Sequence, residues 1–318
     1  MKVLVTGSSG FVGAALCKEL CSLRGLSVVG SSRTDFRLPV DNYTFVKFDD
    51  SLEVAEWGDA LQGVDVVVHL AARAHVLSET SIDPLAEFRK ANVINTLALA
   101  EQALVAGVKR FIFISSIGVN GACSYKSEFT ELSRPNPHAL YATSKWEAEQ
   151  GLTRLLHRTE LELVIIRPPL VYAANAPGNF KKLLKIVSAG MPCPFSMVNN
   201  RRSLIALENL VDFIVTCLEH PRAANQVFLV ADKTPVSTAQ IVEYLAAGMS
   251  TKARLFPMPQ LILKLVATTV GQRSLYTQLC ESLEIDADKA YSMLSWTPPI
   301  EVDSALKKAG YQFKNGIS

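Results

Sequence analysis

The chain has 318 residues, 49% hydrophobic and 19% charged, a composition that supports a packed core and excludes a disordered chain. Its formal net charge of +2 is too balanced to indicate nucleic-acid binding on electrostatic grounds. The six cysteines are scattered without the paired spacing of a metal site, so we expect free thiols in a reducing compartment and no bound metal.

The first residues, MKVLV, resemble the start of a signal peptide, but the polar, glycine-rich residues 6–10 interrupt the apolar run. A cleaved leader is therefore not expected. No stretch of about 20 apolar residues is present, so a membrane-spanning helix is not expected either. Residues 261–267, LILKLVA, predict a core helix in preference to a helix on a membrane surface. We expect a cytoplasmic protein that binds neither membranes nor nucleic acids.

Apolar runs alternate with helical patterns through the first half of the chain. The runs that predict strands are residues 3–5, 27–29, 43–48, 64–70, 110–114 and 163–166. The helical patterns cover residues 11–23, 85–106 and 141–157, and Gly107 is a suitable residue to end the second of them. Strands that are apolar on both faces and alternate with helices predict an α/β fold with a doubly wound parallel Rossmann sheet.

The alternation loosens after Pro168-Pro169. Residues 172–202 contain several prolines and glycines and predict a loop-rich segment, whereas residues 226–230 predict a strand that returns to the first sheet. We therefore expect a dinucleotide-binding domain of residues 1–170, with residues 205–232 returning to it. Residues 171–204 and 233–318 would form a smaller, discontinuous α+β substrate-binding domain.

Residues 6–13, TGSSGFVG, lie between the first strand and the first helix. The glycines allow a tight turn, a close approach of the backbone to a pyrophosphate, and close packing of helix on strand. The N-terminus of the helix then faces the phosphates with free N–H groups. A tight turn without a ligand is the alternative, but the position directly after a leading strand favours a dinucleotide.

The G-x-x-G-x-x-G spacing resembles the short-chain dehydrogenase/reductase superfamily, particularly its extended branch that acts on nucleotide sugars. Further similarities follow in the family's order: VHLAA at 68–72, Asn92, Ser115-Ser116, Tyr141 with Lys145, RPPLVY at 167–172, and WTP at 296–298. Each motif alone is only moderately specific. Their common order and spacing over nearly the whole chain identify the sequence as a member of this superfamily.

NAD-binding sites usually carry an acidic residue after the second strand, which binds the ribose hydroxyls. This sequence has Ser31-Ser32-Arg33 there, and Arg33 suits a 2′-phosphate, so NADP(H) is favoured over NAD(H). The alternative is that Arg33 caps the strand or stacks on adenine while NAD binds. The resemblance implies cofactor contacts at Gly7, Ser9, Gly10, Phe11, Val12, Gly13, Ser32, Arg33, Asp49, Asp50, Leu70, Ala71, Ala72, Arg73, Asn92, Tyr141, Lys145 and Pro168.

In this resemblance Tyr141 is the catalytic acid/base, Lys145 assists it, and Ser116 binds the reacting oxygen; Ser115 is the nearer rival for the serine role. An ammonium about 4 Å from the phenolate, at an effective dielectric near 20, contributes about 4 kcal/mol. That would lower the tyrosine pKa by roughly three units, from about 10 toward 7, where acid/base catalysis is efficient. The alternative is an ordinary pair of residues four apart on a helix surface.

The resemblance also implies substrate contacts. Asn179 and Arg202 stand where relatives hold a substrate diphosphate, and Phe195 either flanks a nucleobase or packs within its loop. Asn120-Gly121 departs from the Tyr-Gly of many relatives, which leaves contacts at the sugar edge open.

The leading hypothesis is an oxidoreductase acting at C4 of a UDP-sugar in polysaccharide biosynthesis, namely a 4-ketoreductase of a UDP-4-keto-6-deoxy-hexosamine. A UDP-sugar 4-epimerase that retains NAD is the first alternative, and a non-catalytic NAD(P)-binding sensor or scaffold is the second. Many relatives are homodimers, and helices at residues 85–106 and 141–157 would form the dimer contact.

Overall fold

The computed structural model describes residues 1–48, 55–74, 83–125 and 127–317. Its central sheet has seven parallel strands in the spatial order β3-β2-β1-β4-β5-β6-β9. In chain order they are β1 (Lys2–Thr6), β2 (Ser27–Ser32), β3 (Tyr43–Lys47), β4 (Val66–His69), β5 (Arg110–Ile114), β6 (Glu162–Arg167) and β9 (Gln226–Leu229). These strands confirm the seven expected from the sequence. The strand order reverses between β1 and β4, where a doubly wound sheet opens a crevice at the carboxyl ends.

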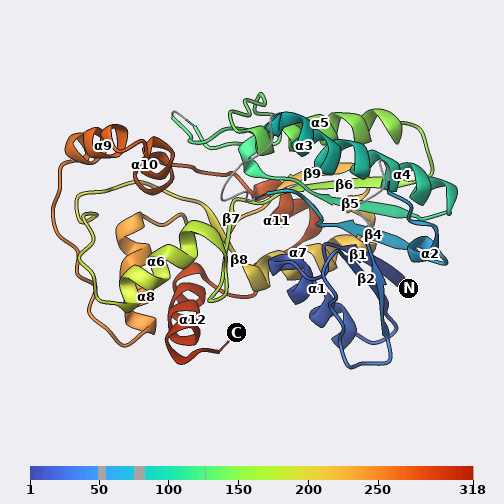
Figure 1. Cartoon of the computed structure of the whole chain (residues 1–318), viewed down its shortest axis with the longest axis horizontal. Helices are drawn as coiled ribbons and strands as arrows, with labels where there is room; N and C mark the ends of the chain where they lie inside the picture. The colour runs from blue at the N-terminus through green and yellow to red at the C-terminus, as the bar shows by residue number, and fades with distance from the viewer. Residues whose placement is uncertain (49–54, 75–82, 126, 318) are drawn as a thin grey trace.

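Helices cover both faces of this sheet, which is why its strands are apolar on both sides (Figure 1). One face carries α3 (Pro84–Arg89), α4 (Asn95–Val105) and α5 (Leu140–Leu155), and the other carries α1 (Phe11–Ser22) and α7 (Leu207–Glu219). Helix α2 (Gly58–Leu61) is a short turn before β4. The 3₁₀ turns η2 (Ile117–Val119) and η3 (Pro221–Ala223) follow β5 and α7.

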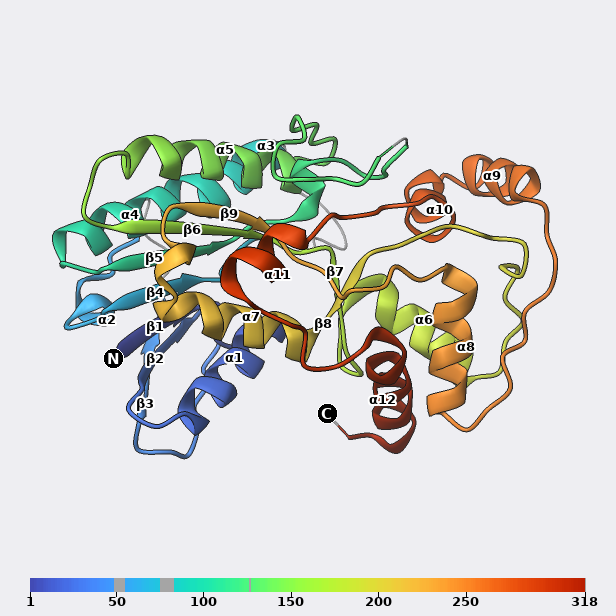
Figure 2. The same ribbon diagram turned by 180° about the vertical axis from the view of Figure 1, so that it is seen from behind.

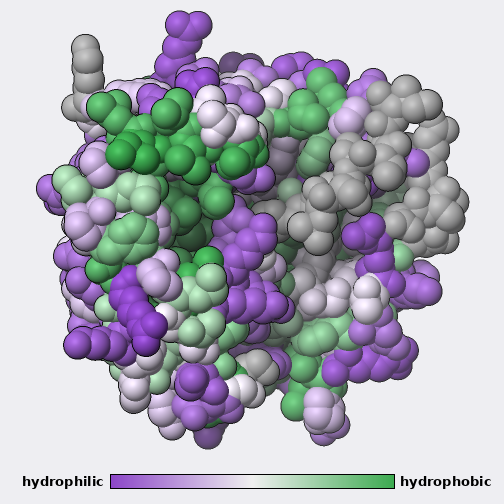
Figure 3. Space-filling model, turned by 60° about the vertical axis from the view of Figure 1, so that its left-hand side comes forward, coloured by the Kyte–Doolittle hydropathy of each residue, from purple (hydrophilic) through white to green (hydrophobic). Residues whose placement is uncertain are grey.

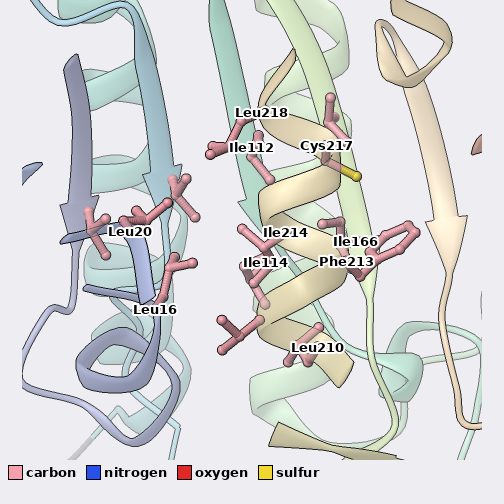
Figure 4. Close-up of a cluster of buried hydrophobic side chains, with 14 of the residues drawn as sticks. Leu16, Leu20, Ile112, Ile114, Ile166, Leu210, Phe213, Ile214, Cys217 and Leu218 are labelled. Carbon is pink, nitrogen blue, oxygen red and sulfur yellow. The ribbon is translucent and has the colours of Figure 1, made fainter. Parts of the chain in front are cut away.

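The core on the α7 side is dense with branched and aromatic side chains (Figure 4). Phe213 and Ile214 of α7 face Ile112 and Ile166 of the sheet. Full burial of one such side chain stabilises the fold by about 1.5–3 kcal/mol. The segment 205–232 therefore returns to the first sheet as expected, through both α7 and β9.

The C-terminal part contributes to this same core. Helix α11 (Asp288–Leu294) lies beside α7 in Figure 2. Trp296, just beyond it, meets Phe213 edge-on with ring centroids 4.9 Å apart. Residues 288–296, expected in the second domain, thus pack against the Rossmann sheet, because Ala290, Leu294 and Trp296 supply apolar surface that the sheet buries.

A second lobe lies at the left of Figure 1. It contains the parallel pair β7 (Leu170–Tyr172) and β8 (Leu204–Ala206), and the helices α6 (Gly178–Ser188), α8 (Thr238–Gly248), α9 (Gln260–Thr269), α10 (Arg273–Cys280) and α12 (Val302–Asn315). Helices α8 and α12 approach closely: a Cβ on Gly248 would lie 1.9 Å from the Lys307 carbonyl oxygen. The lobe surrounds its own apolar cluster.

Residues 172–202 are rich in loops, as expected, and they also contain the eleven-residue α6, whose Phe180, Leu183, Leu184 and Val187 form an apolar face that the lobe buries. One expectation for this lobe was wrong. Helix α9 is not a core helix, since none of its residues is buried and only its inner side meets the neighbouring α10. Among the described residues, no helix is both long and apolar enough to cross a lipid bilayer.

The helical region expected at 85–106 is present but irregular. A π-helical turn, η1 (Lys90–Ile94), separates α3 from α4, and the region ends at Gly107, which has a left-handed φ of 76°.

The cysteines are free thiols, as expected; five are buried and Cys21 is half-buried.

His69, at the end of β4, is buried between two hydroxyls. Its Nδ1 lies 2.7 Å from Thr6 Oγ1, and its Nε2 lies 2.8 Å from Thr96 Oγ1. Thr96 donates its only hydroxyl proton to the Asn92 carbonyl (2.9 Å), so its oxygen accepts from Nε2–H. These contacts suit the neutral ring, in which Nδ1 accepts from Thr6. Burial, aided by the positive charge of Lys145, lowers the pKa of His69 to about 3.

We expect this histidine to make the protein acid-sensitive. Its pKa is about 6.5 in the unfolded chain and about 3 in the folded one, so below pH 6.5 the unfolded state binds the extra proton. Stability is then lost progressively as pH falls through that window, by roughly 2 kcal/mol between pH 6.5 and pH 5. Urea unfolding of wild type and His69→Gln at both pH values measures this, and equal pH slopes would contradict it.

Candidate functional site

The glycine turn between β1 and α1 lies against the backbone of the loop after β4 and against the first turn of α1. Gly7 has a left-handed φ of 70°, and a Cβ there would lie 2.8 Å from the Ala71 nitrogen. A Cβ on Gly13 would lie 2.1 Å from the Gly7 oxygen, so α1 packs tightly onto the turn. Ser9 and Gly10 are exposed, and among the described residues no side chain caps α1. The helix therefore begins with backbone N–H groups available to an anion.

The end of β2 carries hydroxyls in place of a carboxylate. Ser32 Oγ accepts a hydrogen bond from Ser8 Oγ (3.4 Å) and donates to the Thr34 oxygen (2.6 Å). Ser31 Oγ is buried without a protein partner in the described part of the chain. Arg33 is exposed beside them, and the nearest acid in sequence, Asp35, pairs with Arg37 at 3.0 Å. The expected adenine contacts at Asp49 and Asp50 lie outside the described residues.

The loop after β4 lies directly over the glycine turn. The Ala71 nitrogen donates to Thr6 Oγ1 (3.3 Å), which places Leu70, Ala71 and Ala72 beside Gly7. Phe11 and Val12, at the start of α1, are half-buried against the core and leave only part of their surface free.

Asn92 holds this loop to α5. Its Oδ1 accepts from the Arg73 nitrogen (2.7 Å), while its Nδ2 donates to the Arg73 oxygen (3.0 Å) and to Ser144 Oγ (2.9 Å). The π turn contains Asn92, whose side chain is buried between this loop and α5. Both amide hydrogens are used within the protein, so a ribose or water contact would have to reach its oxygen.

The two serines after β5 occupy different surroundings. Ser116 is half-buried, and its Oγ accepts from the Gly118 nitrogen (3.1 Å) at the start of η2. A Cβ on Gly118 would lie 3.2 Å from the Ala142 Cβ, so this turn packs on the first turn of α5. Ser115 is buried, and its Oγ has no protein partner among the described residues. Pro168 supports the turn by accepting from the Ile117 nitrogen (3.0 Å).

Tyr141 and Lys145 lie on the same side of α5, facing the end of β5. Lys145 is 1% exposed and donates through Nζ to the Ile114 carbonyl (2.8 Å). The same ammonium lies 4.4 Å from the centre of the Phe113 ring and 6.0 Å from that of Tyr141. The alternative of an exposed surface pair is therefore wrong for Lys145.

The expected fall of the Tyr141 pKa is not found in this structure. Burial raises the pKa of Tyr141 to about 12, and burial lowers the pKa of Lys145 to about 7, with Glu149 opposing the second shift. The expectation assumed a fully charged lysine about 4 Å from the phenolate. Instead, the ammonium is directed at a backbone carbonyl and is easily neutralised by desolvation.

A buried ion pair below Lys145 was missed from the sequence. Glu149, one turn further along α5, receives hydrogen bonds from Arg167 Nε (2.9 Å) and Nη2, and Arg167 Nη1 donates to Asn120 Oδ1 (3.0 Å). Both charged side chains are at most 5% exposed. Asn120, the residue that departs from the family pattern, is therefore buried against Arg167. Arg167 lies within the RPPLVY motif, but its partner carried no sequence signal.

Helix α10 brings the expected diphosphate contacts together. Asn179 Nδ2 donates to Gln278 Oε1 (2.7 Å), and Arg202 Nη1 donates to the Glu281 carbonyl (2.8 Å) just past the helix. Arg202 is 8% exposed, and burial lowers its pKa to about 10. Arg202 is therefore not a solvated surface arginine. Gln278 was not foreseen, because its only signal is its position in the folded chain.

Phe195 is half-buried and packs with the cluster of Val198, Tyr276 and Cys280. This contact supports the packing interpretation over a free nucleobase platform.

A groove of about 580 Å³ lies elsewhere, between α5 and the β6–β9 edge, and it is lined by Trp146 and Val227 among others. None of the expected catalytic residues lines this groove.

The crevice fits a dinucleotide. Side chains at Gly7 and Gly13 would collide with backbone, α1 begins uncapped, and the buried hydroxyls of Ser31 and Ser115 lack protein partners in the described residues. These features lie at the carboxyl ends of β1, β2 and β5, beside the reversal of strand order. Together with the Ser-Tyr-Lys group they define an NAD(P)-binding enzyme of the short-chain dehydrogenase/reductase type.

The comparisons make this assignment specific: the chain belongs to the NAD dependent epimerase/dehydratase family, whose model matches residues 3–231. It is 39% identical to a UDP-glucose 4-epimerase of Vibrio cholerae over 317 residues, covering 98% of this chain and 95% of that protein. It is 27% identical, over 81% of this chain and 75% of the relative, to an N-acetyl-alpha-D-glucosaminyl-diphospho-ditrans,octacis-undecaprenol 4-epimerase of Escherichia coli O157:H7. Its fold matches a UDP-glucuronic acid 4-epimerase from Bacillus cereus in complex with NAD with a TM-score of 0.79, at 21% identity, covering 100% and 99% of the two chains.

We expect Gly7→Ala to abolish dinucleotide binding. The added Cβ would push the Ala71 backbone away from the turn, and the left-handed φ would cost roughly 1 kcal/mol in addition. Gly63→Ala is the matched control, because Gly63 has a similar φ of 67° and nothing within 4 Å of the new Cβ. Calorimetric titration with NAD should show at least a tenfold loss of affinity for Gly7→Ala and no loss for Gly63→Ala. Equal affinities would place the dinucleotide elsewhere.

Proposed function

We propose that the protein catalyses hydride transfer at C4 of a UDP-linked sugar, with Tyr141 as the proton-transfer group. The observation that carries this proposal is the convergence of Ser116, Tyr141 and Lys145 at the carboxyl end of β5. The UDP-sugar enzymes among the relatives and structural neighbours support the substrate class. The E. coli relative, named for a lipid-linked glycan precursor, supports a place in polysaccharide biosynthesis.

The residues would act as follows in the reducing direction. A dinucleotide held by the glycine turn of Gly7 and Gly13 would supply a hydride for the C4 carbonyl carbon. Tyr141 donates its phenolic proton to O4, which becomes a hydroxyl, and the phenolate regains a proton from solvent. Ser116 donates a hydrogen bond to the same oxygen and positions it. Lys145, held by the Ile114 carbonyl, stabilises the phenolate when it is charged.

Asn179 and Arg202 would hold the substrate diphosphate. Both meet α10, so the amide and the guanidinium stand close to one helix despite their distance in sequence. Arg202 already donates to backbone carbonyls and is largely buried, which fixes the guanidinium fork in one direction. A preorganised fork suits two phosphate oxygens better than a flexible lysine does.

Among enzymes of this kind, a 4-ketoreductase using NADPH is favoured by the end of β2. Ser31, Ser32 and Arg33 provide hydroxyls and a cation where NAD-specific sites carry an acid. A 2′-phosphate would be repelled by that acid and attracted by Arg33. The unpartnered Ser31 hydroxyl supports a further hydrogen bond at this end of the cofactor.

A 4-epimerase that retains NAD is the second candidate. The Vibrio relative shares 39% of its residues over nearly the whole chain, and its name is that of an epimerase. The same three residues would serve this reaction, with the hydride returned to the opposite face of the sugar. The two candidates therefore differ at the cofactor and not at the proton-transfer group.

A homodimer through α4 and α5 completes the proposal. Val105 at the end of α4 is 89% exposed, and Ile94 at its start is 48% exposed. Arg89 and Glu147 pair across the neighbouring α3–α5 contact, which keeps these helices in one rigid layer. Exposed apolar side chains on a rigid helical layer suit a self-complementary contact.

Tyr141→Phe should abolish turnover while leaving dinucleotide binding intact. Loss of a general acid typically costs roughly 10²–10⁴-fold in rate, and the phenyl ring preserves the packing. Tyr311→Phe is the control, since Tyr311 is 56% exposed on α12. Activity would be followed with UDP-sugar substrates and binding with calorimetry. Full activity in Tyr141→Phe would refute the proposed role. Normal dinucleotide binding in an inactive variant shows that the protein is still folded and that only the chemical step is lost.

The cofactor should separate the two reactions. A ketoreductase is expected to leave purification with little retained dinucleotide and to bind NADPH at least tenfold more tightly than NADH. Arg33→Ala should remove that preference, whereas Arg37→Ala, which alters an exposed arginine paired with Asp35, should keep it. Denaturing fresh protein and identifying the released nucleotide provides the measurement. Stoichiometric NAD in the released fraction would overturn the reductase in favour of the epimerase.

A further inference from the structure

Helix α9 presents an apolar face to solvent. Leu261 is 82% exposed, Leu265 65%, Val270 62%, Val266 52% and Ile262 48%. We call these five residues the α9 patch. In Figure 3 hydrophobic side chains gather at the top of the face that turns forward from the left of Figure 1, where α9 and α10 lie. Soluble proteins seldom expose so many large apolar side chains together without a partner for them.

The exposure follows from the phase of the helix. Leu263 and Ala267, four residues apart, point inward and pack on the cluster of Val198, Tyr276 and Cys280. Leu261, Ile262 and Leu265 stand on the opposite side of the same helix, Val266 lies at the edge of that side, and Val270 follows the last turn. The inward contacts fix α9 on the lobe, so the patch is held outward and cannot turn into the core.

The charges within the segment that carries the patch have one sign. Residues 244–280 contain no aspartate or glutamate, and their four charged residues are all cationic. These are Lys252, Arg254, Lys264 and Arg273, and all four are exposed. Lys264 lies within α9 itself, while Arg273 begins α10. An exposed apolar strip within a cationic, acid-free segment matches the surface of an anionic bilayer.

We propose that the α9 patch binds the surface of an anionic phospholipid membrane. The apolar side chains enter the boundary between headgroups and acyl chains, and Lys264 of α9 and Arg273 of α10 meet the lipid phosphates. A helix of ten residues lies along the surface and does not span it. A second copy of the chain suits the patch less well, because a two-fold contact would bring the two sets of cations together.

Membrane binding here would orient the candidate site. Helix α10 packs on α9, and the residues just beyond the patch, Gln278 and Glu281, contact Asn179 and Arg202. The substrate side of the enzyme would therefore face the bilayer, while the β1–β3 end of the sheet points away (Figure 1). The proposal reverses the expectation from the sequence that the protein contacts no membrane.

Vesicle flotation tests the proposal with the full chain. Wild type should float with vesicles of 30% phosphatidylglycerol in phosphatidylcholine and should stay at the bottom with pure phosphatidylcholine. Leu261→Ser/Leu265→Ser should lose at least tenfold in bound fraction. Lys264→Glu/Arg273→Glu should lose a similar factor, since each cation near a charged bilayer contributes roughly fivefold. High salt should weaken the binding of wild type.

The controls match each change elsewhere on the surface. Leu132→Ser/Val40→Ser removes two apolar side chains that are 96% and 44% exposed, and Lys18→Glu/Lys314→Glu reverses two exposed lysines. Both should float like wild type, and all variants should keep wild-type melting temperatures. Wild type that floats no better with the anionic vesicles than with the neutral ones overturns the proposal. A native mass by light scattering that is halved by Leu261→Ser/Leu265→Ser also overturns it, because a second copy would then cover the patch.

Discussion

The buried ammonium of Lys145 ties helix α5 to the carboxyl end of β5 through the Ile114 carbonyl, and the candidate site is arranged around that contact. Tyr141 precedes it by one turn, and the turn that carries Ser116 packs on the same end of α5. A lysine that is 1% exposed is costly to bury, so the fold must supply compensation. It does so with a carbonyl, two aromatic faces and a carboxylate one turn away.

That carboxylate is itself held in place. Glu149 is paired with Arg167, whose remaining donor reaches Asn120, so a chain of buried charges runs from β6 through α5 to the serine turn. Two effects on the pKa of Lys145 oppose each other. Desolvation lowers the pKa, and the negative charge of Glu149 raises it. A pKa near 7 places this lysine at the point where modest changes nearby alter its charge. The surroundings of Lys145, and of Tyr141 one turn before it, are thus set by buried residues of α5 and β6.

The sequence predicted the sheet well because fully apolar strands and glycine stops are local signals, as at residues 110–114 and Gly107. Ser116, Tyr141 and Lys145 were singled out through the order of motifs. What could not be predicted depends on tertiary contacts: nothing local shows that Arg202 is buried against the end of α10, or that Glu149 faces Arg167. Helix α9 was misjudged for the same reason, since hydrophobicity alone does not reveal whether a neighbouring element covers a short helix.

The π turn at Lys90–Ile94 contains Asn92 and interrupts the helical region only locally. Such a turn contains one more residue than the regular helix, and Asn92 occupies that irregularity. Insertion or loss of a single codon in this region would therefore rotate the amide into or out of the crevice while the flanking helices keep their packing. A single-residue insertion or deletion during evolution would therefore make or break the hydrogen bonds between Asn92 and the Arg73 backbone.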